Sequence, residues 1–210
     1  NNLTLNSGTW TLQGPLVSGA TTLNGGVAQF NDNAAFGSGV LTSNGGILQA
    51  SNAGLTLANQ INLGAGGLTL QGINGTTLNG VISGSGGLTK IGSGQLNLHG
   101  INTYTGNSVL NGGVVLVGNN QAFSTGGITV GGSSSISATT PISLANAITL
   151  NSTLTATGTG ALTLGGVISG AANLTKTGSG SLTLNGSNTY TGTTRLSAGT
   201  LRVGSTNERR

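Results

Sequence analysis

The sequence predicts an all-β protein, and more specifically a parallel β-solenoid of about ten coils. Three observations support this fold class: short segments in which apolar and polar residues alternate, abundant glycine with very few charges, and a long internal repeat. Short strands, tight corners and a unit that stacks on copies of itself are the parts that such a fold requires.

Alternation of apolar and polar residues predicts the strands. The clearest runs are LTLNSGTWTLQ (3–13), GLTLANQINL (54–63) and AITLNSTLTAT (147–157), and their period of two is that of a strand with one buried face. Glycine occurs 41 times in 210 residues, which is too often for helices of more than about two turns. We therefore expect strands of about three to six residues, separated by turns rich in Gly, Asn, Ser and Thr.

The charged residues are too few and too scattered to suggest a charged partner. Asp32 and Glu208 are the only acids, and six lysine and arginine residues are spread over 210 positions. A nucleic-acid site needs basic residues gathered on one face, so we expect no nucleic-acid partner. Cysteine is absent, which excludes disulfides and thiolate metal sites, and we expect no cofactor.

An internal repeat organises the whole chain. Residues 81–118 and 167–204 are identical at 22 of 38 positions when aligned at an offset of 86. Upstream, LNGGVAQFNDNAAFGSG (23–39) matches LNGGVVLVGNNQAFSTG (110–126) at an offset of 87. We therefore expect one continuous solenoid segment of a longer protein, made of a partial unit, two full units and a tail at residues 1–22, 23–109, 110–204 and 205–210.

Of the architectures that accommodate short strands, the solenoid fits this repeat best. Propeller blades of about 40 to 45 residues usually carry more aromatic and acidic residues, and a sandwich does not explain the one-residue slips between copies. In a solenoid, a unit of 86 residues divides into roughly four coils of about 21 residues, and slips fall in the turns. Equivalent residues of the two copies would then lie four coils apart in one row.

The sequence lacks the groups that catalysis requires, and we expect no enzyme activity. General acid–base chemistry commonly uses two carboxylates at a fixed distance, whereas Asp32 and Glu208 lie far apart in the sequence. His99 is the single histidine, and Asn185 replaces it in the second copy. We interpret His99 as an exposed turn residue rather than a catalytic base or metal ligand.

Two lysines and two tyrosines recur at equivalent positions: Lys90 with Lys176, and Tyr104 with Tyr190. One hypothesis is a periodic surface row that contacts anionic glycans or lipopolysaccharide. The alternative, which we favour, is that the lysines keep a strand face soluble while each tyrosine packs across a turn with its hydroxyl in water. Trp10 and the three phenylalanines are expected to fill the interior.

The repeated strings resemble a known family. GVISG, LTKxGSGxLxLxG and NTYTG occur in this order within residues 80–106 and again within 166–192, and they are similar to the autotransporter-associated β-strand repeat of type V secreted bacterial surface proteins. The resemblance implies a right-handed parallel β-helix that is exported through the outer membrane and displayed on the cell surface. It also implies a partner, the translocator β-barrel at the C-terminus of the parent protein. The first, partial copy departs from the pattern, because GPLVSGATTLNGG (14–26) lacks the tyrosine.

These features together predict a structural module. We expect an extracellular stalk of an autotransporter passenger that supports secretion and surface presentation. The alternative is an adhesion or self-association module, which would bind a host surface, a glycan or an identical rod through its side wall or its coil ends.

Overall fold

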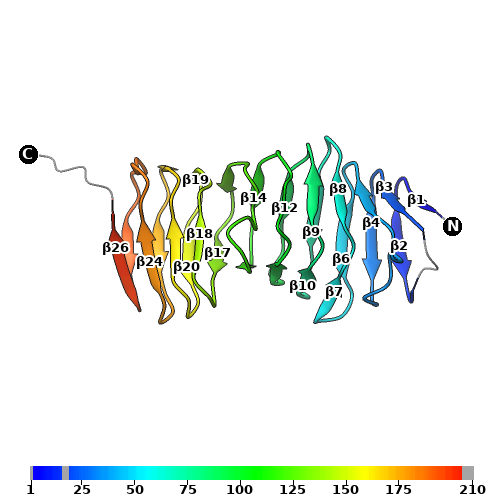
Figure 1. The fold of residues 1–210 in the computed structure, drawn as a ribbon, viewed down its shortest axis with the longest axis horizontal. Coiled ribbons are helices and arrows are strands. Elements are labelled where there is room, and N and C mark those ends of the chain that lie inside the picture. The colour runs from blue at the N-terminus through cyan, green and yellow to red at the C-terminus, as the bar shows by residue number, and fades with distance from the viewer. Residues whose placement is uncertain (1, 16–18, 205–210) are drawn as a thin grey trace, which may run out of the picture.

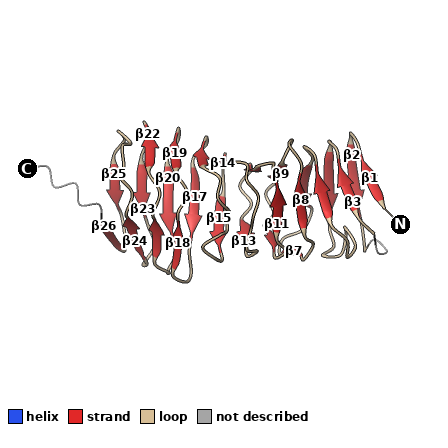
Figure 2. Cartoon of the chain, turned by 45° about the horizontal axis from the view of Figure 1, so that its top comes forward, coloured by secondary structure: helices blue, strands red, loops and turns tan. Residues whose placement is uncertain are grey.

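The computed structural model describes residues 2–15 and 19–204 as a rod of stacked coils, with β1 (Leu3–Leu5) and β26 (Thr200–Val203) at opposite ends (Figure 1). Within these residues the chain forms strands and turns only (Figure 2), and no helix is present that could cross a membrane. Every strand pair is parallel, and each strand hydrogen-bonds to the strand one coil away. The predicted all-β parallel solenoid of about ten coils is confirmed.

The strands form three faces that the chain visits in a fixed order. Face 1 carries two sheets: β1, β3 (Thr21–Leu23), β5 (Leu41–Ser43), β8 (Ile61–Leu63) and β11 (Ile82–Gly84), then β18 (Ile142–Leu144), β21 (Leu162–Leu164), β24 (Ser181–Leu184) and β26. Face 2 consists of β2 (Thr9–Leu12), β4 (Val27–Phe30), β6 (Ile47–Ala50), β9 (Leu68–Gln71), β12 (Leu88–Lys90), β14 (Ser108–Leu110), β16 (Ile128–Val130), β19 (Ile148–Leu150) and β22 (Ile168–Gly170). Face 3 consists of β7 (Leu55–Leu57), β10 (Thr76–Leu78), β13 (Leu96–Leu98), β15 (Val114–Val117), β17 (Ser134–Ser137), β20 (Leu154–Thr157), β23 (Leu174–Lys176) and β25 (Thr194–Leu196).

The core lies between the three faces and runs the length of the rod. In most three-residue strands the central side chain points outward and the two flanking side chains are buried, as in Leu55–Leu57 and Leu162–Leu164. Leu, Ile and Val at the inward positions stack on one another in successive coils. This arrangement is the physical reason for the alternation in the sequence, because successive side chains of a strand point to opposite faces.

The aromatic residues are divided between the core and the surface. Phe30, Phe36 and Phe123 are fully buried, as the sequence predicted. The prediction for Trp10 was wrong: its side chain is 43% exposed, and its Nε1 donates to the carbonyl oxygen of Ser7 at 2.8 Å. Trp10 pairs with the buried Ala28 of the next coil and so occupies an inward position of β2. It is exposed because β2 is the end strand of its sheet, with no described coil covering its other side.

The corners are built from amide ladders and glycines. Asn44 donates to Asn24 at 2.8 Å, and Asn24 donates to Asn6 at 2.9 Å, so one side-chain row continues through three coils. Gly26 has a φ of 71°, and a Cβ at this position would lie 2.4 Å from the carbonyl oxygen of Gly8. Coils can therefore approach one another at such a corner only where a glycine is present.

The repeat unit is not a whole number of coils, which corrects the expectation of four coils per unit. From Leu68 to Ile168 on face 2, each paired residue lies 20 positions from the last. Four such coils account for 80 of the 86 residues, and the remaining six carry the chain on to the next face. Hence β12 lies on face 2 but its equivalent β23 lies on face 3, and β13 on face 3 corresponds to β24 on face 1. The second copy is thus rotated by one face relative to the first.

Candidate functional site

The lysine of each copy lies inside the solenoid rather than on a strand face. Lys90 ends β12 and is only 3% exposed. Its Nζ donates to the carbonyl oxygens of Ile91 at 2.9 Å and Gly92 at 2.7 Å, and it lies 3.5 Å from the carbonyl oxygen of Gly112 in the next coil. Lys176 is also buried and repeats this arrangement with Thr177, Gly178 and Ala198. Each lysine therefore hydrogen-bonds to the carbonyl oxygens of its own corner and contacts the corner of the next coil.

Burial shifts the pKa of both lysines. Desolvation lowers the pKa of Lys90 to about 8 and also lowers the pKa of Lys176, because a low-dielectric site disfavours the charged amine. A Cβ at Gly113 would lie 2.9 Å from Nζ of Lys90, and a Cβ at Gly199 would lie 2.8 Å from Nζ of Lys176. In both copies, the lysine side chain therefore packs against a glycine of the following coil, at a position where a larger residue would collide with it.

The tyrosine of the first copy is also an interior residue. Tyr104 is 0% exposed, and its hydroxyl shares a hydrogen bond of 2.7 Å with Oγ of Ser108, which is itself buried. Burial raises the pKa of Tyr104 to about 12, and the bond with Ser108 partly opposes this rise. In the second copy Tyr190 is half-buried and pairs in the same way with Thr194.

An asparagine clamps three coils together where face 1 has no strand. Asn102 is buried, its Oδ1 accepts from the backbone N–H of Ile82 at 2.9 Å, and its Nδ2 donates to the carbonyl oxygen of Ala122 at 2.7 Å. Ile82 lies one coil before it and Ala122 one coil after it. In the second copy Oδ1 of Asn188 accepts from the N–H of Ile168, also at 2.9 Å. This side chain takes over hydrogen bonds that a strand would otherwise provide.

Two segments, residues 88–117 and 174–203, match the family model of the passenger-associated-transport-repeat. The chain carries two passenger-associated transport repeats. The lysine, the tyrosine and the bridging asparagine of each copy (Lys90, Tyr104 and Asn102; Lys176, Tyr190 and Asn188) lie inside these segments. No curated protein and no solved structure matched the chain.

The transport repeat confirms the resemblance to an autotransporter passenger repeat that the sequence suggested. It indicates a role in an autotransporter passenger, and with it export to the cell surface. Each matched segment begins at the strand that carries the buried lysine, β12 or β23, and ends in the strand β15 or β26. In the first copy, the matched segment therefore contains the corner at Lys90, the clamp residue Asn102 and the strand β15 in which the segment ends.

The structure contradicts the predicted surface row. Lys90, Lys176 and Tyr104 are buried, so they cannot contact a glycan or lipopolysaccharide, and the lysines do not solubilise a strand face either. The rotation between copies also places the two lysines on different faces. Both predictions failed because LTK was interpreted as a strand with an outward lysine, whereas the third residue of these strands points inward.

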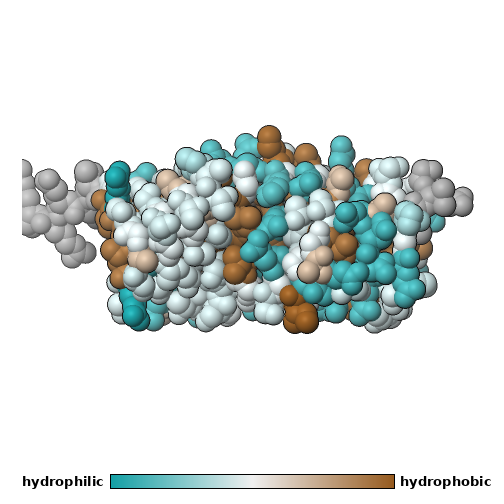
Figure 3. Space-filling view, turned by 90° about the horizontal axis from the view of Figure 1, so that it is seen from below, coloured by the Kyte–Doolittle hydropathy of each residue, from teal (hydrophilic) through white to brown (hydrophobic). Residues whose placement is uncertain are grey.

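The remaining candidates lie at the surface and apart from one another. His99 is exposed at the end of β13, as predicted. Asp32 accepts from the N–H of Ala34 at 2.7 Å and stabilises a local turn. In the part of the chain that the structure describes, no three His, Asp or Glu side chains gather as metal ligands. Hydrophobic residues on the side of the rod shown in Figure 3 form separate patches rather than one broad face.

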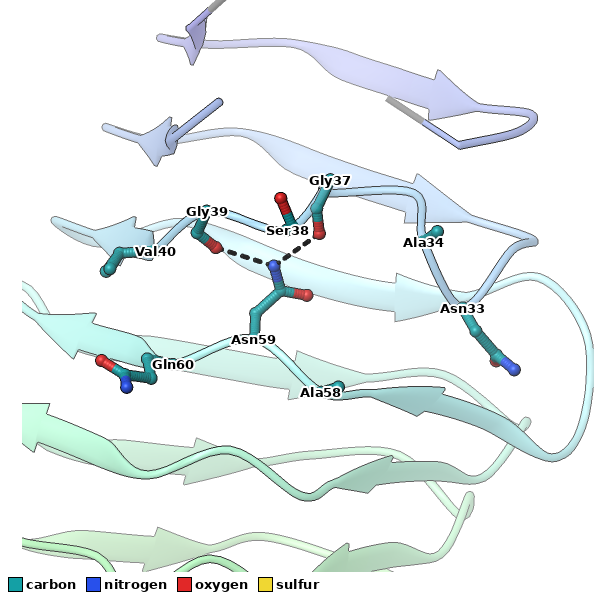
Figure 4. A pocket seen from close by; sticks show the side chains of 9 residues that line it. All are labelled: Asn33, Ala34, Gly37, Ser38, Gly39, Val40, Ala58, Asn59 and Gln60. Carbon is teal, nitrogen blue, oxygen red and sulfur yellow. Dashed lines mark hydrogen bonds between the residues drawn. The ribbon is translucent and has the colours of Figure 1, made fainter. Parts of the chain in front are cut away.

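A pocket opens on the side wall near one end of the rod, between residues 33–40 and 58–60 (Figure 4). Its volume is about 600 Å³. It is lined by Asn33, Ala34, Gly37, Ser38, Gly39, Val40, Ala58, Asn59 and Gln60. This pocket could not be predicted from the sequence, because its walls come from two coils that are brought together only by stacking.

Proposed function

We propose that the chain is a structural stalk segment of an autotransporter passenger, which supports export and presents the protein at the bacterial cell surface. The observation that carries the proposal is the clamp of the transport repeat. Asn102 takes one backbone partner from the preceding coil and one from the following coil. The repeat is therefore completed only when the next coil has stacked on it.

Such a clamp gives stacking a direction. A buried polar group without a partner costs about 1–3 kcal/mol, so a repeat at the growing end is stabilised when the next coil covers it. Lys90 also contacts the next coil, because its Nζ lies 3.5 Å from the carbonyl oxygen of Gly112. Coils that fold one after another outside the cell would oppose backsliding of the chain through the translocator barrel of the parent protein. In this proposal the polar groups of the repeat have structural rather than catalytic roles.

Deletion of one unit tests the proposal. The chain would be displayed by fusing it to the translocator domain of an autotransporter, with an N-terminal epitope for detection. Deleting residues 88–173 removes one transport repeat and joins Gly87 to Leu174, the equivalent of Leu88. We expect the amount of epitope on the cell surface to fall several-fold, measured by flow cytometry at equal expression.

The matched control removes one coil but no transport repeat. Deleting residues 148–167 joins Ala147 to Ile168, which occupies the same position on face 2 as Ile148, and it should leave surface yield close to that of the parent. Unchanged export after loss of the repeat would contradict the secretion role, and losses in proportion to the number of coils removed in the two deletions would show that only rod length matters.

Adhesion through the side wall is a second candidate function. The pocket between residues 33–40 and 58–60 favours it, because a purely structural rod does not need an open pocket with polar groups in its walls.

A further inference from the structure

We propose that the pocket between residues 33–40 and 58–60 binds a neutral, hydroxylated ligand, a saccharide in chemical class. This goes beyond the stalk function and gives the adhesive candidate a ligand. The volume of about 600 Å³ lies within the usual range of small-molecule sites. The pocket lies on the outer wall of the rod, so a ligand can reach it without any coil opening.

Asn59 provides a fixed hydrogen-bond acceptor in this pocket. Its side chain is only 6% exposed, and its Nδ2 donates to the carbonyl oxygens of Gly37 at 2.9 Å and Gly39 at 2.8 Å. These two bonds fix the orientation of the amide. Oδ1 points away from both bonds into the space between the two wall segments (Figure 4). No residue in the described ranges donates to this oxygen, and a ligand hydroxyl can do so.

The other groups of the wall suit a saccharide better than an ion. No charged residue lines the pocket, so an anion or cation would lose its hydration without gaining a partner charge. The amide of Gln60 and the hydroxyl of Ser38 both donate and accept, which matches hydroxyl groups that do the same. Oδ1 of Asn33 already accepts from the N–H of Thr56 at 2.8 Å, so this amide offers its Nδ2 as a donor. Val40, Ala34 and Ala58 supply apolar surface for the C–H groups of a sugar ring.

The second copy provides an internal comparison. Asn146 is the equivalent of Asn59, and its Nδ2 likewise lies within hydrogen-bond distance of backbone carbonyl oxygens, here those of Phe123, Ser124 and Gly126. There, however, Oδ1 of Asn146 and Oγ of Ser124 are fully buried without a partner. Gln121 replaces Ala34, and Ala147 replaces Gln60. The bonds from the asparagine amide to the carbonyl oxygens of the turn are therefore common to both copies. An acceptor oxygen that a ligand can reach is found at Asn59.

Saturation-transfer NMR on the full chain tests the inference, with lactose, cellobiose and N,N′-diacetylchitobiose as neutral probes and glucuronic acid as the charged probe. We expect transfer to at least one neutral disaccharide and none to glucuronic acid. The double variant Ala34→Gln/Gln60→Ala introduces two of the residues of the second copy into the pocket. It should weaken binding by about tenfold or more and leave the thermal unfolding midpoint unchanged, since both positions are exposed.

Gln121→Ala, at the equivalent position of the second copy, is the matched control and should bind like the parent. The proposal is overturned if no neutral probe binds, if glucuronic acid binds equally well, or if the double variant binds like the parent. None of these outcomes bears on export, so failure of this inference and failure of the stalk function are distinguishable.

Discussion

At the scale of single residues, the transport repeat is defined by polar side chains that are buried and hydrogen-bonded, mostly to the backbone. Lys90 donates to carbonyl oxygens at its own corner, Tyr104 bonds to Ser108, and Asn102 bridges two coils. Buried polar groups are retained where their hydrogen bonds are complete. The recurrence of these residues in both copies follows from this requirement, because substituting one partner leaves the other buried and unpaired.

The buried amine of Lys90 predicts a rise of stability with alkaline pH. Its pKa is about 8 when folded and near 10.5 when unfolded, so between these values the unfolded chain binds more protons and the free energy of unfolding increases with pH. The increase attributable to Lys90 is about 3 kcal/mol. Tyr104 acts in the opposite sense above about pH 10, because its pKa is raised to about 12 by folding. Stability should therefore be greatest near pH 10.

Denaturant unfolding monitored by circular dichroism between pH 7 and 11 measures this profile. In the Lys90→Met variant the free energy of unfolding should rise less between pH 8 and 10.5. The rise that remains is the contribution of Lys176. Arg195→Met, which removes an exposed cation, should leave the profile unchanged. An identical rise in the Lys90→Met variant would show that this lysine is not desolvated in the folded state.

At the scale of elements, corners determine how closely the coils stack. Gly8 and Gly113 both have positive φ angles, 78° and 69°. A Cβ at Gly8 meets nothing within 4 Å, whereas a Cβ at Gly113 would lie 2.7 Å from the carbonyl oxygen of Gly92 and 2.9 Å from Nζ of Lys90. The two positions therefore separate the cost of the backbone conformation from the cost of close approach.

Alanine substitutions at these two corners should differ in their effect on stability. Gly8→Ala is expected to lower the free energy of unfolding by about 1–2 kcal/mol, the cost of a left-handed conformation. Gly113→Ala should cost more, because the neighbouring backbone must also move and the lysine contact is lost. Chemical denaturation of both variants measures the difference, and equal losses would contradict the close approach of the two coils.

The strands and their inward residues were predictable from the sequence, because period-two alternation reports burial directly. The lysine and tyrosine sites were not, since a lysine in a polar, glycine-rich segment is normally exposed and only stacking supplies carbonyl partners. A signal was nevertheless present for Asn102: NTYTG recurs without an apolar alternation, which suggests side chains that replace a strand. The pocket at Asn59 depends on the packing of one loop against the next coil and left no such signal.

At the scale of the whole molecule, the repeat behaves as a screw operation. Each unit advances four coils and one further face, so the stretch without a strand falls on face 1 in the first copy and on face 2 in the second. The places where the strand-to-strand hydrogen bonds are interrupted therefore fall on different faces in the two copies. We infer that the 86-residue spacing keeps continuous sheets along the rod despite the clamp in each unit.

The surface yield of a double variant measures what the clamp contributes to export. In the chain displayed from a translocator, Asn102→Ala/Asn188→Ala should reduce the surface epitope several-fold. It should also lower the free energy of unfolding of the purified chain by about 2 kcal/mol or more, because buried backbone groups lose their partners. Asn62→Ala, which removes an exposed asparagine of β8 on face 1, should leave both quantities unchanged. Surface yield equal to that of the parent, in a double variant shown to be less stable, would contradict the account.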